Sequence, residues 1–222
     1  MRLLFLFILL IAVTSLLLNA KLISDRITSK RAVFQVSEVI DGDTFKIMSN
    51  NEERRVRLMG VDIPETGKCL SSEAKDKLTQ LVLGKDVVLE DQFSDPYGRI
   101  MANVYAGNIF VNKEMLSSGL GRMDYYENPH KEELKAAYAD AKFKKLGIFS
   151  GICISKTPPV SNKGIPCAIK GNIDDNTQKK IYFLPGCRNY SQVTIDLSTA
   201  DQWFCSENEA VTAGFTKSTT CN

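Results

Sequence analysis

Short runs of alternating apolar and polar residues predict five β-strands in the first two thirds of the chain. Each run is rich in β-branched or aromatic residues and is bounded by turn-forming residues. Between the first two runs, Asp41-Gly42-Asp43 has the composition of a tight turn. The predicted strands are Val33–Val39, Thr44–Met48, Arg55–Val61, Val87–Leu89 and Ile100–Tyr105.

Apolar residues at helical spacing predict about three helices among these strands. The first helix opens at Ser71, carries Leu78, Leu81 and Val82 on one face, and ends by Gly84. It follows the third strand. The other two predicted helices are a short one from Asn112 to near Gly119 and a longer one over Lys131–Leu146.

The composition changes beyond residue 150. Ser155–Pro166 contains three prolines and is predicted to be an inter-domain linker. Further on, Lys180–Leu184 and Val193–Ile195 indicate a hairpin or a pair of strands. Ser206-Glu207-Asn208-Glu209 has the pattern of a capping box and predicts a short helix that ends at Gly214.

The N-terminus is Met1-Arg2 followed by an almost unbroken apolar run over residues 3–18. This is typical of a secretory signal peptide and is short for a membrane-spanning helix, which needs about 20 apolar residues. Leu18 stands where a cleavage site prefers a small residue, so an uncleaved anchor is the alternative. The basic residues within 21–31 would then hold the body of the protein in the cytoplasm.

Length, charge and cysteine content narrow the class of protein. The 222 residues allow one ordinary domain plus a smaller module, and 44% hydrophobic residues suffice for a core. With a net charge of only +2, affinity for nucleic acid must come from local basic clusters such as Arg54–Arg57. The six cysteines favour an oxidising compartment. We therefore expect a secreted or periplasmic protein, and membrane anchoring through residues 3–18 remains the alternative.

Charged residues gather around the second and third predicted strands. Asp41, Asp43 and Asp62 offer hard oxygen ligands to a cation. Arg57 has the planar fork that clamps a phosphate, and Glu65 is a further carboxylate close by. This set is typical of a metal-dependent enzyme that acts on phosphodiesters. If the first two aspartates served only the turn, the other two acids would need a separate explanation.

These residues resemble the calcium-dependent thermonuclease (staphylococcal nuclease) family. The likeness continues in family order through Asp95-Pro96-Tyr97-Gly98-Arg99, Val111-Asn112, Gly119-Leu120 and Leu146–Ser150, and it covers roughly Ala32–Ser150. The resemblance implies an α+β fold, with a five-stranded OB-fold barrel and about three helices. It also implies a small C-terminal module of a kind often appended to bacterial members, here expected to be stabilised by disulfides.

The resemblance assigns roles to individual residues. Glu65 would act as general base, while Arg57 and Arg99 would bind the phosphate more tightly as charge develops in the transition state. Tyr97 would contact the phosphate pocket, and Tyr125 could stack on a base. The implied metal site consists of Asp43, Asp62 and the backbone carbonyl of Ile63 as ligands, with Asp41 nearby.

The implied activity is calcium-dependent hydrolysis of DNA and RNA with little sequence preference, leaving 3′-phosphate ends. Pro96 replaces a basic residue of the family, which leaves any preference for chain ends open. Ca²⁺ is the expected cofactor, nucleic acid the substrate, and no obligate protein partner is evident. Two alternatives remain, a non-catalytic nucleic-acid-binding protein on the same fold and a cell-envelope interaction protein.

The six cysteines are expected to form disulfides. None belongs to a Cys-x-x-Cys pair, although the last four could bind zinc at wide spacing. Three pairs allow fifteen connectivities. We predict Cys69–Cys153, Cys167–Cys205 and Cys187–Cys221, of which the first would tie the active-site loop to the end of the nuclease domain.

His130, the only histidine, is expected to be a surface residue and not a metal ligand.

The predicted division of the chain has five parts. The parts are a signal peptide or anchor (1–20), a linker (21–31), the OB-fold domain (32–150), a second linker (151–166) and the Cys-rich module (167–222).

Overall fold

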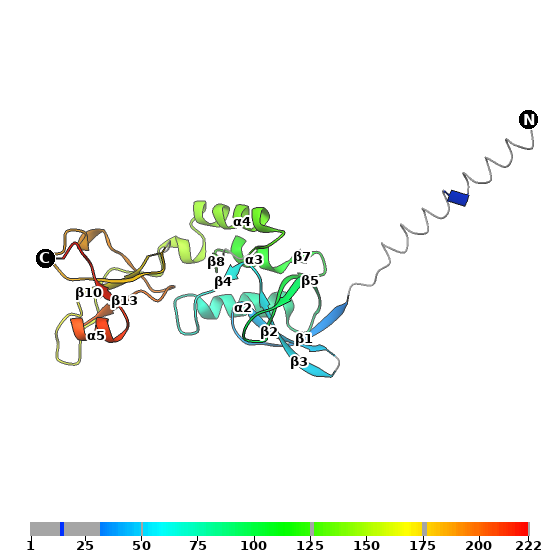
Figure 1. Cartoon of the computed structure of the whole chain (residues 1–222), viewed down its shortest axis with the longest axis horizontal. Coiled ribbons are helices and arrows are strands. Elements are labelled where there is room, and N and C mark those ends of the chain that lie inside the picture. Colours follow the sequence, from blue (N-terminus) through cyan, green and yellow to red (C-terminus); the bar gives the residue numbers. More distant parts are fainter. Residues whose placement is uncertain (1–13, 16–31, 50, 125–126, 175–176, 222) are drawn as a thin grey trace, which may run out of the picture. The chain divides into compact units, whose positions relative to one another are not determined.

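Five strands close into a barrel in the computed structural model (Figure 1). The structure describes residues 14–15, 32–49, 51–124, 127–174 and 177–221. Hydrogen-bonded neighbours follow the order β3-β2-β1-β5-β6, and β6 pairs back with β3, which closes the barrel and confirms the predicted fold. The strands are β1 (Val33–Val39), β2 (Thr44–Ser49), β3 (Glu52–Leu58), β5 (Asp86–Ser94) and β6 (Ile100–Ala106), with β7 (Ile109–Phe110) extending from β6.

The third predicted strand, Arg55–Val61, is divided in the structure. β3 ends at Leu58, and the chain turns at Gly60, whose φ of 76° is in the left-handed region that favours glycine. It resumes as β4 (Val61–Asp62), which pairs with the unpredicted two-residue strand β8 (Arg122–Met123). The segment that carries Asp62 therefore leaves the barrel sheet.

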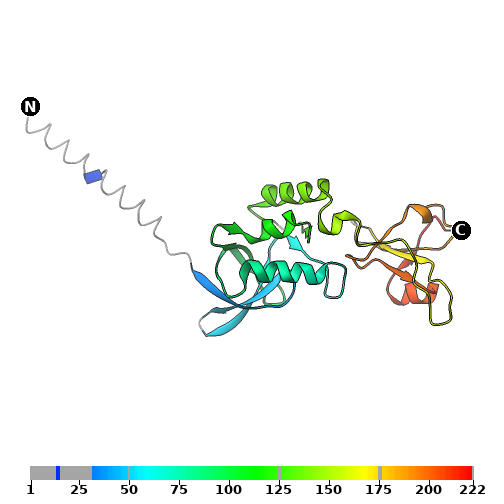
Figure 2. The ribbon, with the colours of Figure 1, turned by 180° about the vertical axis from the view of Figure 1, so that it is seen from behind.

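Three helices pack around the barrel, as predicted. Figures 1 and 2 both show α3 between α2 and α4, and α3 contacts each of them. The last helix ends earlier than its apolar pattern suggests, because Lys145 adopts a left-handed conformation with φ of 54°. The helices are α2 (Ser71–Val82), α3 (Val111–Ser117) and α4 (Lys131–Phe143), followed by the 3₁₀ helix η1 (Gly147–Ser150).

A buried amide fixes the turn between β3 and β4. The side chain of Asn112, fully buried at the start of α3, accepts a hydrogen bond from the Val104 amide at 2.9 Å. Its amide nitrogen donates to the carbonyls of Met59 at 2.9 Å and Ala102 at 3.1 Å. Asn128 donates to the same Met59 carbonyl at 3.4 Å. Since buried backbone groups need partners, these bonds determine where β4 begins.

The C-terminal module has its own small sheet and core. Four strands lie in the order β13-β10-β11-β14, beside a short helix that Ser206 caps as predicted by accepting the Glu209 amide. The buried core residues are Ile169, Tyr182, Phe204, Ala210 and Phe215. The elements are β10 (Ile169–Ile173), β11 (Lys180–Phe183), the 3₁₀ helix η2 (Tyr190–Gln192), β13 (Gln202–Phe204), α5 (Glu207–Thr212) and β14 (Thr216–Lys217).

Lys180–Leu184 and Val193–Ile195 each contribute a strand, as predicted, but the two strands do not form a hairpin with each other. β11 pairs with β10 and β14 instead. The second segment contributes β12 (Ile195–Asp196), which pairs with β9 (Ile154–Ser155) at the beginning of the expected linker. The module is therefore attached by a strand pair to the chain that leaves η1, and Phe34–Asn222 forms one compact unit.

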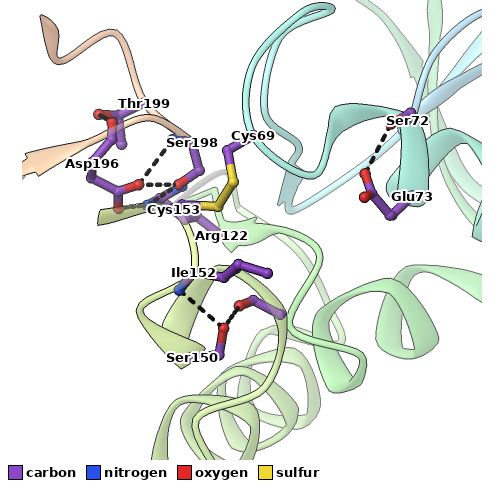
Figure 3. The surroundings of a disulfide bond; sticks show 11 residues. Cys69, Ser72, Glu73, Arg122, Ser150, Ile152, Cys153, Asp196, Ser198 and Thr199 are labelled. Carbon is purple, nitrogen blue, oxygen red and sulfur yellow. Dashed lines mark hydrogen bonds and ion pairs between the residues drawn. A yellow bond between two sulfur atoms is a disulfide. The ribbon is translucent and has the colours of Figure 1, made fainter. Parts of the chain in front are cut away.

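All six cysteines form disulfides, and none is left as a free thiolate for zinc. The pairs are those that the sequence analysis proposes. Figure 3 shows the Cys69–Cys153 bond. The Cys69 amide donates a hydrogen bond to the Leu197 carbonyl at 3.0 Å. The Leu197 amide donates in turn to the Cys153 carbonyl at 2.8 Å. The module thus holds both ends of this disulfide through its backbone.

Most of the predicted signal peptide or anchor, and the linker 21–31, lie outside the described residues. Within the part that is described, no helix is both long and apolar enough to cross a membrane.

We expect reduction to destabilise the module more than the barrel. The Cys167–Cys205 and Cys187–Cys221 bonds close loops of 38 and 34 residues, and each contributes about 4 kcal/mol in the chain-entropy model. The module core is too small to replace this. Hydrogen exchange with and without reductant should show early loss of protection in residues 167–221. Unfolding by a chelator but not by reductant would contradict the disulfide assignment.

Asn112→Ala should lower the free energy of unfolding by about 1–3 kcal/mol. It removes three hydrogen bonds to buried backbone groups. The Met59 and Ala102 carbonyls each keep a second donor, from Asn128 and from the Met59 amide, whereas the Val104 amide loses the Asn112 oxygen, and one unsatisfied buried group costs about 1–3 kcal/mol. Urea denaturation measures the change. Asn108→Ala, at an exposed position between β6 and β7, is the matched control and should change stability little. Equal stability of the two variants would contradict the role of Asn112.

Candidate active site

The Asp41–Asp43 turn lies between β1 and β2 and is shaped by its own carboxylates. The Asp43 amide donates to an Asp41 carboxylate oxygen at 3.1 Å, and the Thr44 hydroxyl donates to Asp43 at 2.8 Å. A β-carbon at Gly42 would collide with the Ile63 side chain. Glycine therefore lets the acidic turn pack directly on the segment that follows β4.

Arg57 joins two of the predicted ligand residues. It lies opposite Thr44 in the β2–β3 register, so its guanidinium reaches the acidic turn. One terminal nitrogen donates to Asp43 Oδ1 at 2.6 Å, and the other donates to Asp62 Oδ1 at 3.4 Å. The Asp43 side chain is only 4% exposed, and this burial raises its pKa to about 7 although Arg57 opposes the shift. The positive charge of one guanidinium thus does not fully offset the free-energy cost of burying the ionised Asp43 carboxylate.

Five of the predicted residues line one small hollow, namely Asp41, Asp43, Arg57, Ile63 and Glu65, whereas Asp62 lies beside it. The hollow's volume of about 20 Å³ suffices for about one water molecule. Among the residues that the structure describes, none donates a hydrogen bond to the exposed Glu65 carboxylate, which leaves that group accessible to a bound water. The lining consists of Asp41, Gly42, Asp43, Arg57, Ile63, Pro64, Glu65 and Thr66.

The donors at this hollow, together with Asp62 beside it, fit a hard divalent cation. Asp43 and Asp62 supply carboxylate oxygens and Ile63 a carbonyl, the ligand types that Ca²⁺ prefers. The raised pKa of Asp43 indicates a deficit of positive charge that a cation would offset. No three of the acids at this site lie within 4.8 Å of one another in the described structure, so bound waters would have to complete the coordination.

Arg99 and Tyr97 lie outside the hollow, on the β5–β6 connection. Arg99 immediately precedes Ile100, the β6 partner of Val56, so it emerges beside the strand that carries Arg57. Its Nε donates to Asp95 at 2.6 Å. The Tyr97 ring is 84% exposed, with the Arg99 guanidinium carbon 5.4 Å from its centroid, so this tyrosine is a surface group and not part of the core. Tyr125 lies outside the described residues.

A second cluster of ligand types occurs at Glu90, Asp91 and His130, whose ligand atoms lie within 4.8 Å of one another. Asp91 also accepts a hydrogen bond from Asn103 at 2.8 Å. His130 is half-buried rather than fully exposed, with an edge contact to Tyr105. These interactions account for the cluster as a packing and hydrogen-bonding unit.

Two basic residues near the hollow were not predicted. Arg122 is opposite Asp62 in the β4–β8 pair, and Lys68 follows the Glu65 turn. A two-residue strand has too few positions for a periodic signal, so nothing in the sequence around Arg122 indicates its neighbour. Lys68 belongs to the short loop before Cys69, and its proximity to the acids depends on that loop's conformation.

Comparisons with known proteins point to one family. Residues 55–151 match the family described as Staphylococcal nuclease homologue. The chain is 33% identical over 128 residues to a thermonuclease of Staphylococcus intermedius, covering 52% of this chain and 75% of the relative. It is 31% identical over 147 residues to the endonuclease YncB of Bacillus subtilis (strain 168), covering 61% and 67%. For a micrococcal nuclease of Shigella flexneri, the identity is 29% over 126 residues, covering 52% and 72%. The chain therefore belongs to the staphylococcal nuclease family.

Proposed function

We propose that the protein is a calcium-dependent nuclease that hydrolyses phosphodiester bonds in both DNA and RNA. The observation that carries the proposal is the placement of Arg57 between Asp43 and Asp62, on the wall of a hollow that Glu65 also lines. The nuclease relatives support the reaction class. The donor chemistry and the family resemblance support the choice of metal and substrate.

Arg57 and Arg99 would bind the phosphate that is cleaved. Arg57 is oriented by its two carboxylate partners, so little conformational entropy is lost when it meets a phosphate oxygen. Arg99 is oriented through Nε by Asp95, and no other acid within the described part of the chain pairs with its terminal nitrogens. Two such guanidinium groups stabilise the charge that grows on the phosphate as water attacks.

Glu65 would accept the proton of the attacking water. Glu65 lines the hollow and follows Asp62 and Ile63 closely in the sequence, so one turn can position all three residues. A carboxylate is a weak base, so the contribution of Glu65 depends on holding the water in line with the bond to the 5′ oxygen. That bond breaks, the 5′ oxygen takes a proton from solvent water and leaves as a hydroxyl, and a 3′-phosphate end remains.

The calcium ligands would be Asp43, Asp62 and the Ile63 carbonyl, and Asp41 would maintain the turn by accepting the Asp43 amide. When bound, Ca²⁺ supplies positive charge to a non-bridging phosphate oxygen. Tyr97 is exposed and could contact the phosphate, and we keep base stacking by Tyr125 as part of the proposal. Stacking and backbone contacts carry little sequence information, which is consistent with a nuclease of broad specificity.

Three disulfides favour an extracellular or periplasmic location. We propose that residues 1–20 direct export and are removed, with an uncleaved anchor through residues 3–18 as the alternative. We also keep the proposed division into an OB-fold domain over residues 32–150, a connection over 151–166 and a C-terminal module over 167–222.

The purified protein should degrade DNA and RNA with Ca²⁺ present and should lose this activity when a chelator is added. The same assay with Mg²⁺ tests the choice of metal. The Arg57→Ala, Glu65→Gln double variant, which lacks both the phosphate clamp and the base, should be inactive. A wild-type protein that binds nucleic acid without cleaving it would instead support the non-catalytic alternative.

Glu65→Gln alone should lower the turnover number by about 10²–10⁴-fold, the usual contribution of a general base. Because Glu65 is not among the proposed ligands, Ca²⁺ should raise the melting temperature of this variant as it does for the wild type. Glu52→Gln, at an exposed position of β3, is the matched control. Unchanged turnover in Glu65→Gln would remove Glu65 as the base, and a lost calcium effect would make it a ligand.

A further inference from the structure

A larger hollow opens directly beside the proposed catalytic hollow. Its volume is about 220 Å³, and its lining includes Asp62 on one side and residues 198–200 of the C-terminal module on the other. The two hollows share Ile63, Pro64 and Glu65. We call the larger one the module-side hollow. A nucleic acid strand whose scissile phosphate lies at Glu65 would therefore have this space next to that phosphate.

The module wall of this hollow is held in place by Arg122. Its guanidinium donates to Asp196 at 2.7 Å and to the Ser198 hydroxyl at 2.9 Å (Figure 3). Ser198 is only 3% exposed and donates its own hydroxyl to Asp196 at 2.6 Å. Arg122 is also the strand partner of Asp62. One side chain thus fixes the module wall relative to a proposed calcium ligand.

Further hydrogen bonds, from the Thr199 hydroxyl and the Leu197 backbone, reinforce the same wall. The Thr199 hydroxyl donates to the Asp196 carbonyl at 2.8 Å and accepts the Asp201 amide at 3.1 Å. Leu197, between these residues, bonds to both partners of the Cys69–Cys153 disulfide. A binding wall that is ordered before the ligand arrives loses little entropy on binding.

The lining suits one nucleotide of a strand. Ile63, Pro64 and Ile173 contribute apolar atoms to the lining, and the half-buried Thr199 and the exposed Ala200 line it from the module. The volume is below the roughly 300–1,000 Å³ of pockets that hold drug-sized ligands. It therefore fits a single base and part of its sugar better than a larger molecule.

Lys68 supplies a positive charge for the adjoining phosphate. Arg122 is neutralised by Asp196, whereas no acid within the described residues lies within ion-pair distance of the Lys68 ammonium. Lys68 lines the module-side hollow and also a hollow on its other side, next to Asp41. Lys68 therefore borders two hollows that lie next to the turn carrying Glu65.

We propose that the module-side hollow is a nucleotide subsite of the enzyme, in which one base of a single-stranded nucleic acid packs against residues 198–200 while Lys68 contacts the neighbouring phosphate. This inference rests on the proposed nuclease function and extends it. The C-terminal module then forms part of the substrate-binding surface.

The test measures binding of a fluorescently labelled single-stranded oligonucleotide to the purified full chain in the cleavage-deficient Glu65→Gln background with Ca²⁺. Ala200→Trp fills the hollow from an exposed position of the module, and Ala139→Trp adds the same ring to an exposed position of α4. Lys68→Gln removes the ammonium, and Lys142→Gln removes the same charge from an exposed position of α4.

Ala200→Trp should weaken binding about tenfold, in the range expected when one stacked base loses its place. Lys68→Gln should reduce the slope of log affinity against log salt concentration by about 0.7, the value for one phosphate contact on a single strand. Both control variants should bind like the Glu65→Gln parent. Equal affinity of Ala200→Trp and Ala139→Trp would overturn the base subsite, and an unchanged salt slope in Lys68→Gln would overturn the phosphate contact.

A parallel cleavage assay separates this proposal from the one on which it rests. A chain with native Glu65 that fails to cleave DNA or RNA would refute the nuclease function. A chain that cleaves while the Ala200→Trp and Lys68→Gln variants bind like their controls would refute the subsite alone.

Discussion

The contact between Arg57 and the buried Asp43 is the constraint on which the rest of the site depends. A carboxylate that is 4% exposed must have a charged or hydrogen-bonding partner, and breaking such a pair from one side costs about 3–5 kcal/mol. The pair forms because β2 and β3 are adjacent in the barrel and because Gly42 lets the acidic turn lie against Ile63. The same interaction therefore stabilises the barrel and positions the groups proposed to bind phosphate and metal.

Barrel closure extends this constraint to the other side of the site. The parallel pairing of β3 with β6 brings the strand of Arg57 beside the turn that carries Arg99. The turn at Gly60 then takes the chain out of the sheet, so that Asp62 and Glu65 lie beside the barrel and not within it. The site is accordingly assembled from three connections, each attached to a rigid strand.

The sequence pattern predicts the barrel strands because they are long enough to show alternation and their turns contain Asp-Gly or Asp-Pro-Tyr-Gly, whereas the closed five-stranded barrel is implied by the family resemblance. The sequence also identifies the residues that line the small hollow, since Asp41, Asp43, Arg57, Ile63 and Glu65 do meet there. It does not indicate the pairs β4–β8 and β9–β12, whose two-residue strands depend entirely on contacts between distant segments. For that reason Arg122, which lies on β8, could not be assigned from sequence alone. Lys68 could not be assigned either, because its position depends on the conformation of the loop before Cys69.

The hydrogen bond from the Cys69 amide to the Leu197 carbonyl has a consequence for the order in which the molecule is completed. Leu197, which belongs to the C-terminal module, is the hydrogen-bond partner of Cys69, and Cys69 lies only four residues after Glu65. A chain that emerges N-terminus first can form most of the barrel early, but the loop before Cys69 obtains its last partners only when the module has followed. Completion of the region around Glu65 therefore coincides with the arrival of nearly the whole polypeptide in the compartment where its disulfides form.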